Sequence, residues 1–176
     1  MSGHNKFSKI KHQKAKNDGQ KSKIFGKLVR FITVEAKKAG GNLKSPGLSL
    51  AIEKAKKENM PNDTIDRAIK KATTDNSAAM EHITYESYGP GGIAILIEAL
   101  TDNRNKATQE IKAILTRHGS ELAAPGSASW AFTKGPEGMK ANMTMPLEDA
   151  DITKLQELVD ALEENDEVQD VYTNAE

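Results

Sequence analysis

Ile93-Ala94-Ile95-Leu96-Ile97-Glu98-Ala99-Leu100 is an apolar run rich in β-branched residues. Such a run predicts a strand buried at the centre of a sheet. The stretch before it, Tyr88-Gly89-Pro90-Gly91-Gly92, has the composition of a turn. Ahead of that turn, Ile83, Tyr85 and Ser87 alternate as in a second strand. We therefore expect residues 83–100 to lie in a sheet.

The residues after this run alternate between helical and extended patterns. Asp102 or Asn103 can cap a helix whose buried face repeats at helical spacing. Alternation over Ala128, Trp130 and Phe132 predicts a strand with Trp130 in the core, and residues 141–147 predict another. A last helix and the strand Val168–Tyr172 follow. From residue 93 the order β-α-β-β-α-β is that of a ferredoxin-like split βαβ domain. The expected buried helical residues are Ala107, Ile111, Ile114, Leu115, Leu155, Leu158, Val159 and Leu162.

Three short helices are expected before residue 75. Apolar residues recur at helical spacing from about Ser22 to Ala39, where Gly40-Gly41 ends the helix. Ser45 and Pro46 have the character of an N-cap and a first helical residue, which start a helix over 46–58. Asn59-Met60-Pro61 interrupts it, and Asn62 or Asp63 can cap a third helix to residue 72.

These patterns predict an α+β protein with four segments. Residues 1–23 have few large apolar side chains, so we expect a basic flexible arm that becomes ordered on its target. A helical domain over 24–75, a linker over 76–82 and the ferredoxin-like domain over 83–176 follow.

Charge is distributed unevenly along the 176 residues. Residues 1–75 hold 18 Lys and Arg against 7 Asp and Glu, whereas residues 76–176 hold 7 against 18. The two halves cancel to a formal net charge of zero. Such asymmetry predicts a polyanionic partner for the basic half. The acidic half is expected to face away from that partner or to meet a basic one.

Several motifs give the chain a resemblance to a known family. In chain order, they are Gly3-His4-Asn5-Lys6-Phe7-Ser8-Lys9-Ile10-Lys11-His12, Ala51-Ile52-Glu53-Lys54-Ala55-Lys56, Asn59-Met60-Pro61, Arg67-Ala68-Ile69-Lys70-Lys71, Tyr88-Gly89-Pro90-Gly91-Gly92, Thr101-Asp102-Asn103-Arg104-Asn105 and Val171-Tyr172-Thr173-Asn174. In these motifs the chain resembles the YebC/PmpR family of transcriptional and translational regulators, over nearly its whole length. The resemblance implies either a DNA-binding regulator or a ribosome-associated factor that contacts rRNA and tRNA and eases stalled elongation.

The chain departs from that family in two ways. Phe7 stands where the family usually carries tryptophan, which keeps an aromatic ring but loses the indole donor. The resemblance also implies a three-domain protein, in which the third domain is inserted in the second. Here residues 134–140 lead almost directly to the next expected strand, so we expect that insertion to be absent.

The candidate nucleic-acid contacts are mostly lysines, which act as mobile point charges and predict recognition of the phosphate backbone more than of base sequence. Histidine and phenylalanine side chains could stack on unpaired bases. A solubilising lysine tail or a solvated helix face is the alternative interpretation. The candidates are His4, Lys6, Phe7, Lys9, Lys11, His12, Lys14, Lys16, Lys21, Lys23, Lys27, Arg30, Arg67, Lys70 and Lys71.

Two loops are candidate contact sites. The glycine loop could present backbone N–H groups to a phosphate, but a turn is favoured because the loop separates two strand patterns. Helix capping explains Asp102 or Asn103, but not Arg104 between two asparagines. The candidate loop residues are Tyr88, Gly89, Gly91, Gly92, Asp102, Asn103, Arg104 and Asn105.

The sequence lacks motifs for catalysis. None of its four histidines has zinc-ligand spacing, and it has neither a nucleophile elbow nor a phosphate-binding loop. We expect a cytoplasmic, monomeric, non-enzymatic protein without cofactor, metal, membrane span or small-molecule substrate. RNA on the ribosome is narrowly favoured as the target over duplex DNA. A protein-interaction module is a further alternative, with the acidic stretch of residues 163–170 as a solvated or docking surface.

Overall fold

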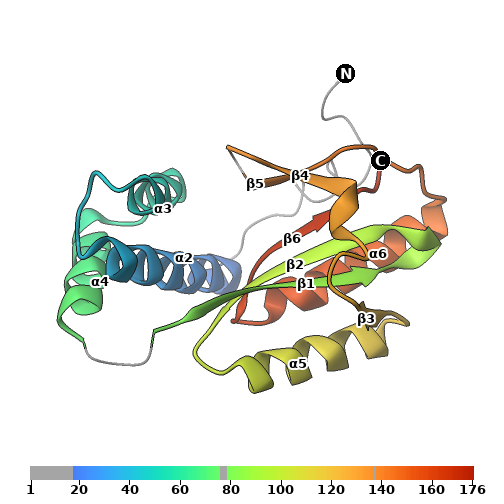
Figure 1. Ribbon diagram of the computed structural model, residues 1–176, viewed down its shortest axis with the longest axis horizontal. Coiled ribbons are helices and arrows are strands. Elements are labelled where there is room, and N and C mark those ends of the chain that lie inside the picture. The colour runs from blue at the N-terminus through green and yellow to red at the C-terminus, as the bar shows by residue number, and fades with distance from the viewer. Residues whose placement is uncertain (1–17, 76–78, 137) are drawn as a thin grey trace. The chain divides into compact units, whose positions relative to one another are not determined.

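The computed structural model describes residues 18–75, 79–136 and 138–176 (Figure 1). The described residues divide into two compact units, one ending at Glu81 and the other running from His82 to Glu176. We call them the helical unit and the sheet unit. Within the described ranges, none of the helices has the length and apolarity to cross a bilayer.

The helical unit contains α2 (Asp18–Ala39), α3 (Pro46–Lys57) and α4 (Asn62–Thr74). Helix α2 packs against both of the others. Its buried Ile32 and Ala36 meet apolar side chains one helical turn apart on α3 and α4, namely Leu48, Ala51, Ala55, Ile65, Ala68 and Ala72. Many of these residues are alanines, so the helices approach closely around a small core.

The helix boundaries correct several expectations. Helix α2 begins at Asp18, so residues 18–23 are helical and do not belong to an arm. Ser45 precedes α3 without a side-chain capping bond, and Pro46 occupies the first turn. Pro61 is the N-cap of α4, so the prediction that Asn62 or Asp63 caps it was wrong. Asn59 takes a left-handed backbone conformation (φ 62°) that ends α3.

The main sheet of the sheet unit has four strands in the order β3-β1-β2-β6 (Figure 1). Strand β1 (Glu81–Tyr88) pairs antiparallel with β3 (Glu121–Ala123), and β2 (Ala94–Thr101) with β6 (Val168–Thr173). The expected central strand therefore lies at the centre. Strand β1 starts two residues before its expected start at residue 83.

Each face of the sheet has its own cover. Ile93, Ile95, Ile97 and Ala99 meet α5 (Arg104–Arg117) and α6 (Asp149–Glu164) on one face. Ala94 and Leu96 point to the other face, where a short 3₁₀ turn η2 (Ser129–Ala131) and a small hairpin cover them. Since successive strand residues alternate between faces, both sets of β2 side chains are buried.

The mixed α+β class, with N-terminal helices followed by an antiparallel sheet domain, is confirmed, but the strands differ from those predicted. The hairpin β4 (Phe132–Gly135) and β5 (Gly138–Ala141) forms a separate two-stranded sheet. Residues 142–147, expected as a strand, contribute only an isolated bridge from Met145 to Ala175. The predicted ferredoxin-like order began at residue 93 and therefore left out β1, which is a strand of the main sheet.

Candidate nucleic-acid interface

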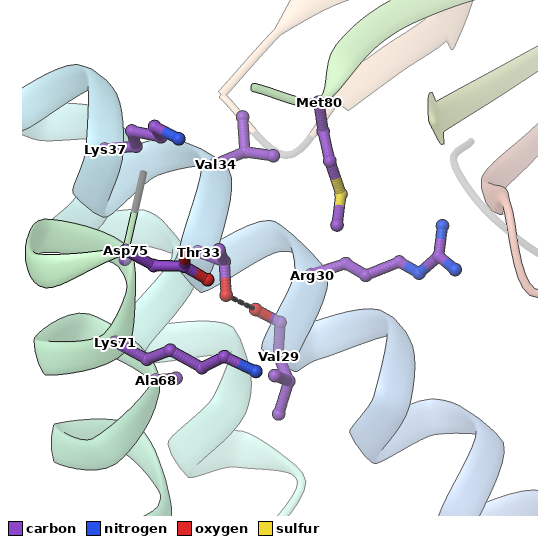
Figure 2. A pocket seen from close by; sticks show the side chains of 10 residues that line it. Val29, Arg30, Thr33, Val34, Lys37, Ala68, Lys71, Asp75 and Met80 are labelled. Atoms are coloured by element: carbon purple, nitrogen blue, oxygen red, sulfur yellow. Dashed lines mark hydrogen bonds between the residues drawn. The ribbon is translucent and has the colours of Figure 1, made fainter. Parts of the chain in front are cut away.

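Helices α2 and α4 enclose a pocket of about 230 Å³ in the helical unit (Figure 2). Its apolar lining comes from Val29 and Val34 on α2 and Ala68 and Ala72 on α4. The hydroxyl of Thr33 donates to the Val29 carbonyl at 2.7 Å. The polar group of this lining threonine is therefore already satisfied within its own helix.

Basic side chains gather around this pocket. Arg30 and Lys37 of α2 and Lys71 of α4 line it, together with Asp75 (Figure 2). Arg30 and Lys37 are seven residues apart, which places them two turns apart on one helix face. Three cations against one carboxylate leave a positive surface that would favour a phosphate group. We call Arg30, Lys37 and Lys71 the basic groove.

The structure brings together only some of the predicted basic residues. Arg30 and Lys71 share the groove, but Arg67 and Lys70 do not line it. The guanidinium of Arg67 instead donates to Asp63, 3.3 Å away on the same helix. The prediction missed Lys37, although its seven-residue spacing from Arg30 was a signal that could have identified it.

The other predicted lysines of α2 lie on its N-terminal half. Lys23, Lys27 and Arg30 follow one another at helical spacing and are half-buried, whereas Lys21 is exposed. A stripe of positive charge therefore leads along α2 towards the groove. The predicted contacts His4, Lys6, Phe7, Lys9, Lys11, His12, Lys14 and Lys16 lie outside the described residues.

The glycine loop forms a turn between β1 and β2. Its residues Pro90–Gly92 make a 3₁₀ turn, in which Gly92 donates to the Gly89 carbonyl at 3.1 Å and Gly89 to that of Ile93 at 2.8 Å. These two N–H groups are therefore engaged within the turn. The loop also packs against Leu147 and the carboxylate of Asp151, whose negative charge opposes a phosphate at this position. A phosphate contact at this loop stays a prediction.

The second candidate loop caps α5. The side chain of Asn103 accepts from the Lys106 N–H at 3.1 Å, and Thr101 and Asn103 exchange two further bonds of 2.9 Å. Asn103 is therefore the capping residue of the two that were considered. Asp102, Arg104 and Asn105 are exposed, and their contact role stays a prediction.

The position of Trp130 differs more from the prediction than that of any other residue discussed above. It is 57% exposed and lies in the turn η2, so its assignment to a buried strand position was wrong. The preceding stretch Ala124-Pro125-Gly126-Ser127 is rich in turn-forming residues. That composition was the signal that the strand begins only at Phe132.

The acidic C-terminal stretch is also not uniformly solvated. Glu167 is 3% exposed, and its carboxylate lies 3.3 Å from the ammonium group of Lys106. Glu167 therefore has a structural role, because its ion pair with Lys106 joins α5 to the start of β6. Among the described residues, no group of three His, Asp or Glu side chains is placed to hold a metal ion.

Comparison with known proteins places both units in one family. The TACO1/YebC protein N-terminal domain matches residues 5–75, and the TACO1/YebC second and third domain matches residues 80–136 and 137–175. These matches cover most of the chain and include both the helical and the sheet unit.

Relatives of this chain are named probable transcriptional regulatory proteins. One from Hydrogenobaculum sp. is 44% identical over 181 residues, covering 99% of this chain and 71% of the relative. One from Thermotoga petrophila is 48% identical over 136 residues, where the aligned part is 76% of this chain but only 54% of the relative. The chain thus spans about half to three quarters of the length of such proteins.

A solved structure has the same fold. The crystal structure of a conserved hypothetical protein from Aquifex aeolicus matches with a TM-score of 0.81 and 32% identity, over 95% of each chain. The matching domains, the relatives and this structure agree, and the chain belongs to the TACO1/YebC family.

Proposed function

We propose that this chain is a cytoplasmic, monomeric, non-enzymatic regulator of gene expression that binds structured RNA on the ribosome through its basic N-terminal part. The observation that carries the proposal is the basic groove, reached by the lysine stripe of α2. Phosphate oxygens are the ligands that such a surface would attract most strongly.

The lysine-rich composition of the basic surface supports RNA as the ligand. The described helical unit carries 13 Lys and Arg against 7 Asp and Glu over residues 18–75. Only Arg30 and Arg67 among these can make bidentate contacts to a base, and Arg67 is engaged with Asp63. Contacts would thus be mainly to the backbone, which suits recognition of RNA shape.

The acidic sheet unit also disfavours a long duplex. It holds 7 Lys and Arg against 17 Asp and Glu over residues 82–176. A domain with that charge would be repelled by a DNA duplex lying along it. On a ribosome, basic proteins lie beside RNA, so each unit could meet a surface of opposite charge.

The second candidate function is transcriptional regulation through duplex DNA. It is favoured by the names of the relatives from Hydrogenobaculum and Thermotoga, which are probable transcriptional regulatory proteins. Dimeric sequence readers usually place a helix with several base-contacting side chains in the major groove. The exposed side chains of α3 and α4 are instead mostly lysines and acids.

We also propose that the third-domain insertion of longer relatives is missing between β4 and β5. The family match divides at residues 136 and 137, within the connection between the paired residues Gly135 and Gly138. The pairing of Gly135 with Gly138 supports this proposal, because only two residues of the chain separate them.

A binding experiment with matched salt tests the proposal. A fragment of ribosomal RNA and a DNA duplex of equal length are titrated with the full chain, with a variant lacking residues 1–17, and with R30Q/K37Q/K71Q. The deletion ends before α2, which begins at Asp18, and so leaves the helix whole. The variant K112Q/R117Q/K154Q makes the same charge change in the sheet unit and serves as control.

We expect RNA to bind more tightly than DNA, with an affinity that falls steeply as salt rises. Loss of three phosphate contacts would reduce the salt slope on duplex by about 2.7. The control variant should bind like the unaltered chain. Equal RNA binding by all four proteins would refute the proposal, and tighter binding to the duplex would establish the second candidate instead. Salt-insensitive ribosome binding that survives the deletion would point to protein docking.

A further inference from the structure

An exposed aromatic side chain stands on the sheet unit, outside the basic surface of the helical unit. Trp130 is 57% exposed, and Tyr88 beside it is 39% exposed. A large apolar ring left in water forgoes the free energy of burial. Exposure of both rings at one place therefore indicates a surface prepared for a partner.

The indole N–H of Trp130 is already used. It donates to the Ser127 carbonyl at 2.7 Å and lies 3.2 Å from the Tyr88 hydroxyl. The Tyr88 hydroxyl in turn donates to that same carbonyl. Since the polar edge of the indole is satisfied, a partner can use only the face of the ring. Recognition would therefore be by stacking, without a hydrogen bond to the indole.

The backbone that carries Trp130 is held in place from below. The buried carboxylate of Glu86 accepts from the N–H groups of Gly126 at 2.6 Å, Ala128 at 2.9 Å and Ser129 at 2.6 Å. Burial by itself raises the pKa of Glu86, but these hydrogen bonds outweigh it and hold the pKa below its ordinary value of 4.5. The carboxylate is thus ionised at neutral pH. A ring on such a loop loses little conformational entropy when a partner binds.

The hairpin fixes the other side of the same turn. The Asn142 side chain donates to the Trp130 carbonyl at 3.0 Å and also bonds to the hydroxyl of Thr133. Thr133 lies opposite Lys140 in the hairpin. Since paired residues share a face, the exposed Lys140 lies on the same face of the hairpin as Thr133, which Asn142 joins to the Trp130 carbonyl.

The charge of the hairpin indicates the kind of partner. Lys140 is exposed and forms no ion pair with another described residue, whereas Lys134 pairs with Met139 and so points to the other face of the hairpin. Lys140 stands out in a unit where acids outnumber bases by 17 to 7. Glu121 lies opposite Tyr88 on β3. A stacking ring with a lysine on the neighbouring face of the hairpin favours a partner with aromatic rings and negative charge over an arginine-rich peptide.

We propose that Trp130 and Tyr88, with Lys140, form a binding site for an unpaired nucleotide of a single-stranded nucleic acid. The base stacks on the exposed face of Trp130, and Lys140 attracts a flanking phosphate. The site takes bases of any identity, because every base has a face and no hydrogen-bond donor of the indole is left to discriminate. It adds a second contact to the proposed function, on the other unit of the chain.

Trp130 is the only tryptophan of the chain, so its fluorescence reports this site alone. Oligo(dT), a blunt DNA duplex and an oligoarginine peptide are each titrated while the Trp130 emission is recorded. We expect saturable loss of emission with oligo(dT) and little change with the duplex, whose bases are already stacked. Binding of labelled oligo(dT) is measured separately by anisotropy.

Variants separate stacking from charge. W130A should weaken oligo(dT) binding about tenfold, since one stacked base contributes on the order of 1–3 kcal/mol. K140Q should bind more weakly at low salt but still lose emission at saturation. K154Q, on the exposed face of α6, controls for the loss of a positive charge. Unchanged circular dichroism of W130A shows that this variant is folded.

The outcomes also separate this site from the basic groove. If R30Q/K37Q/K71Q binds ribosomal RNA normally, the proposed function is refuted, yet emission loss with oligo(dT) would still support the site. Bound oligo(dT) that leaves the Trp130 emission unchanged would overturn the site. So would emission loss with oligoarginine but not with oligo(dT), or W130A binding as tightly as the unaltered chain.

Discussion

Replacement of Glu86 by glutamine should loosen the turn that carries Trp130. One carboxylate oxygen accepts from Ala128 and Ser129, and the other accepts from Gly126. A glutamine oxygen can keep the first two bonds in neutral form, but its NH₂ group would face the Gly126 N–H as a second donor. One hydrogen bond is lost, and the other two become weaker because their acceptor is no longer charged.

The expected cost follows from these three bonds. Hydrogen bonds to charged groups contribute about 1.5–3 kcal/mol each, and neutral ones about 1 kcal/mol. E86Q should therefore lower the free energy of unfolding by about 2–4 kcal/mol, a large share of the roughly 5–15 kcal/mol of an ordinary domain. The control E98Q lies on the same sheet face, where Glu98 is 3.5 Å from the His82 imidazole. That partly exposed pair should contribute less than about 1 kcal/mol.

Urea unfolding followed by Trp130 emission measures this cost in the sheet unit, where the only tryptophan lies. The pH dependence adds a second test. The pKa of Glu86 is held below 4.5 in the folded chain, so below that pH the unfolded chain takes up the proton more readily. The stability of the unaltered chain should therefore fall on acidification, and its advantage over E86Q should shrink. An E86Q variant as stable as E98Q at neutral pH would refute this reasoning.

Three further predictions concern other parts of the chain. N103A removes the side-chain cap of α5 and should lower the free energy of unfolding by about 1 kcal/mol, whereas N103D, which keeps an acceptor, should not. G138A should cost about 1–3 kcal/mol, because Gly138 has φ +118° and an added methyl group would meet the Tyr172 hydroxyl; an unchanged denaturation midpoint would contradict it. K37Q and K71Q should each reduce the salt slope of ribosomal RNA binding by about 1, while K112Q leaves it unchanged, as measured by titration at several salt concentrations.

Much of the fold could be predicted because local patterns agreed with tertiary packing. The strand over Ile93–Leu100 and the buried faces of α5 and α6 follow from residues whose spacing matches strand or helix geometry. The turn at Pro90–Gly92 follows from glycine and proline, whose backbone preferences are strong.

The fold predictions failed where the alternating pattern was short or where residues distant in sequence determine the local structure. Alternation over Ala128, Trp130 and Phe132 is equally compatible with a 3₁₀ turn fixed by hydrogen bonds to Glu86, some 40 residues earlier in the chain. Sequence spacing cannot show that contact. The pairing of β1 with the distant β3 was hidden for the same reason, since β3 is only three residues long.

The site was predicted in part. Arg30 and Lys71 were identified from charge alone, but charge does not show which lysines of α4 face α2. The buried Ala68 and Ala72 fix the orientation of the helix and bring Lys71, not Lys70, to the groove. The role of Trp130 needed the structure, because its exposure depends on the hairpin and the Glu86 carboxylate.

Co-sedimentation with ribosomes, compared with a duplex DNA shift at the same salt concentration, tests most directly whether positive charge in the helical unit brings this chain to RNA. The unaltered chain should pellet with ribosomes and shift duplex DNA weakly, and R30Q/K37Q/K71Q should remain in the supernatant while K112Q/R117Q/K154Q still pellets. Pelleting of R30Q/K37Q/K71Q to the same extent as the unaltered chain, or a DNA shift without any pelleting, would contradict that account.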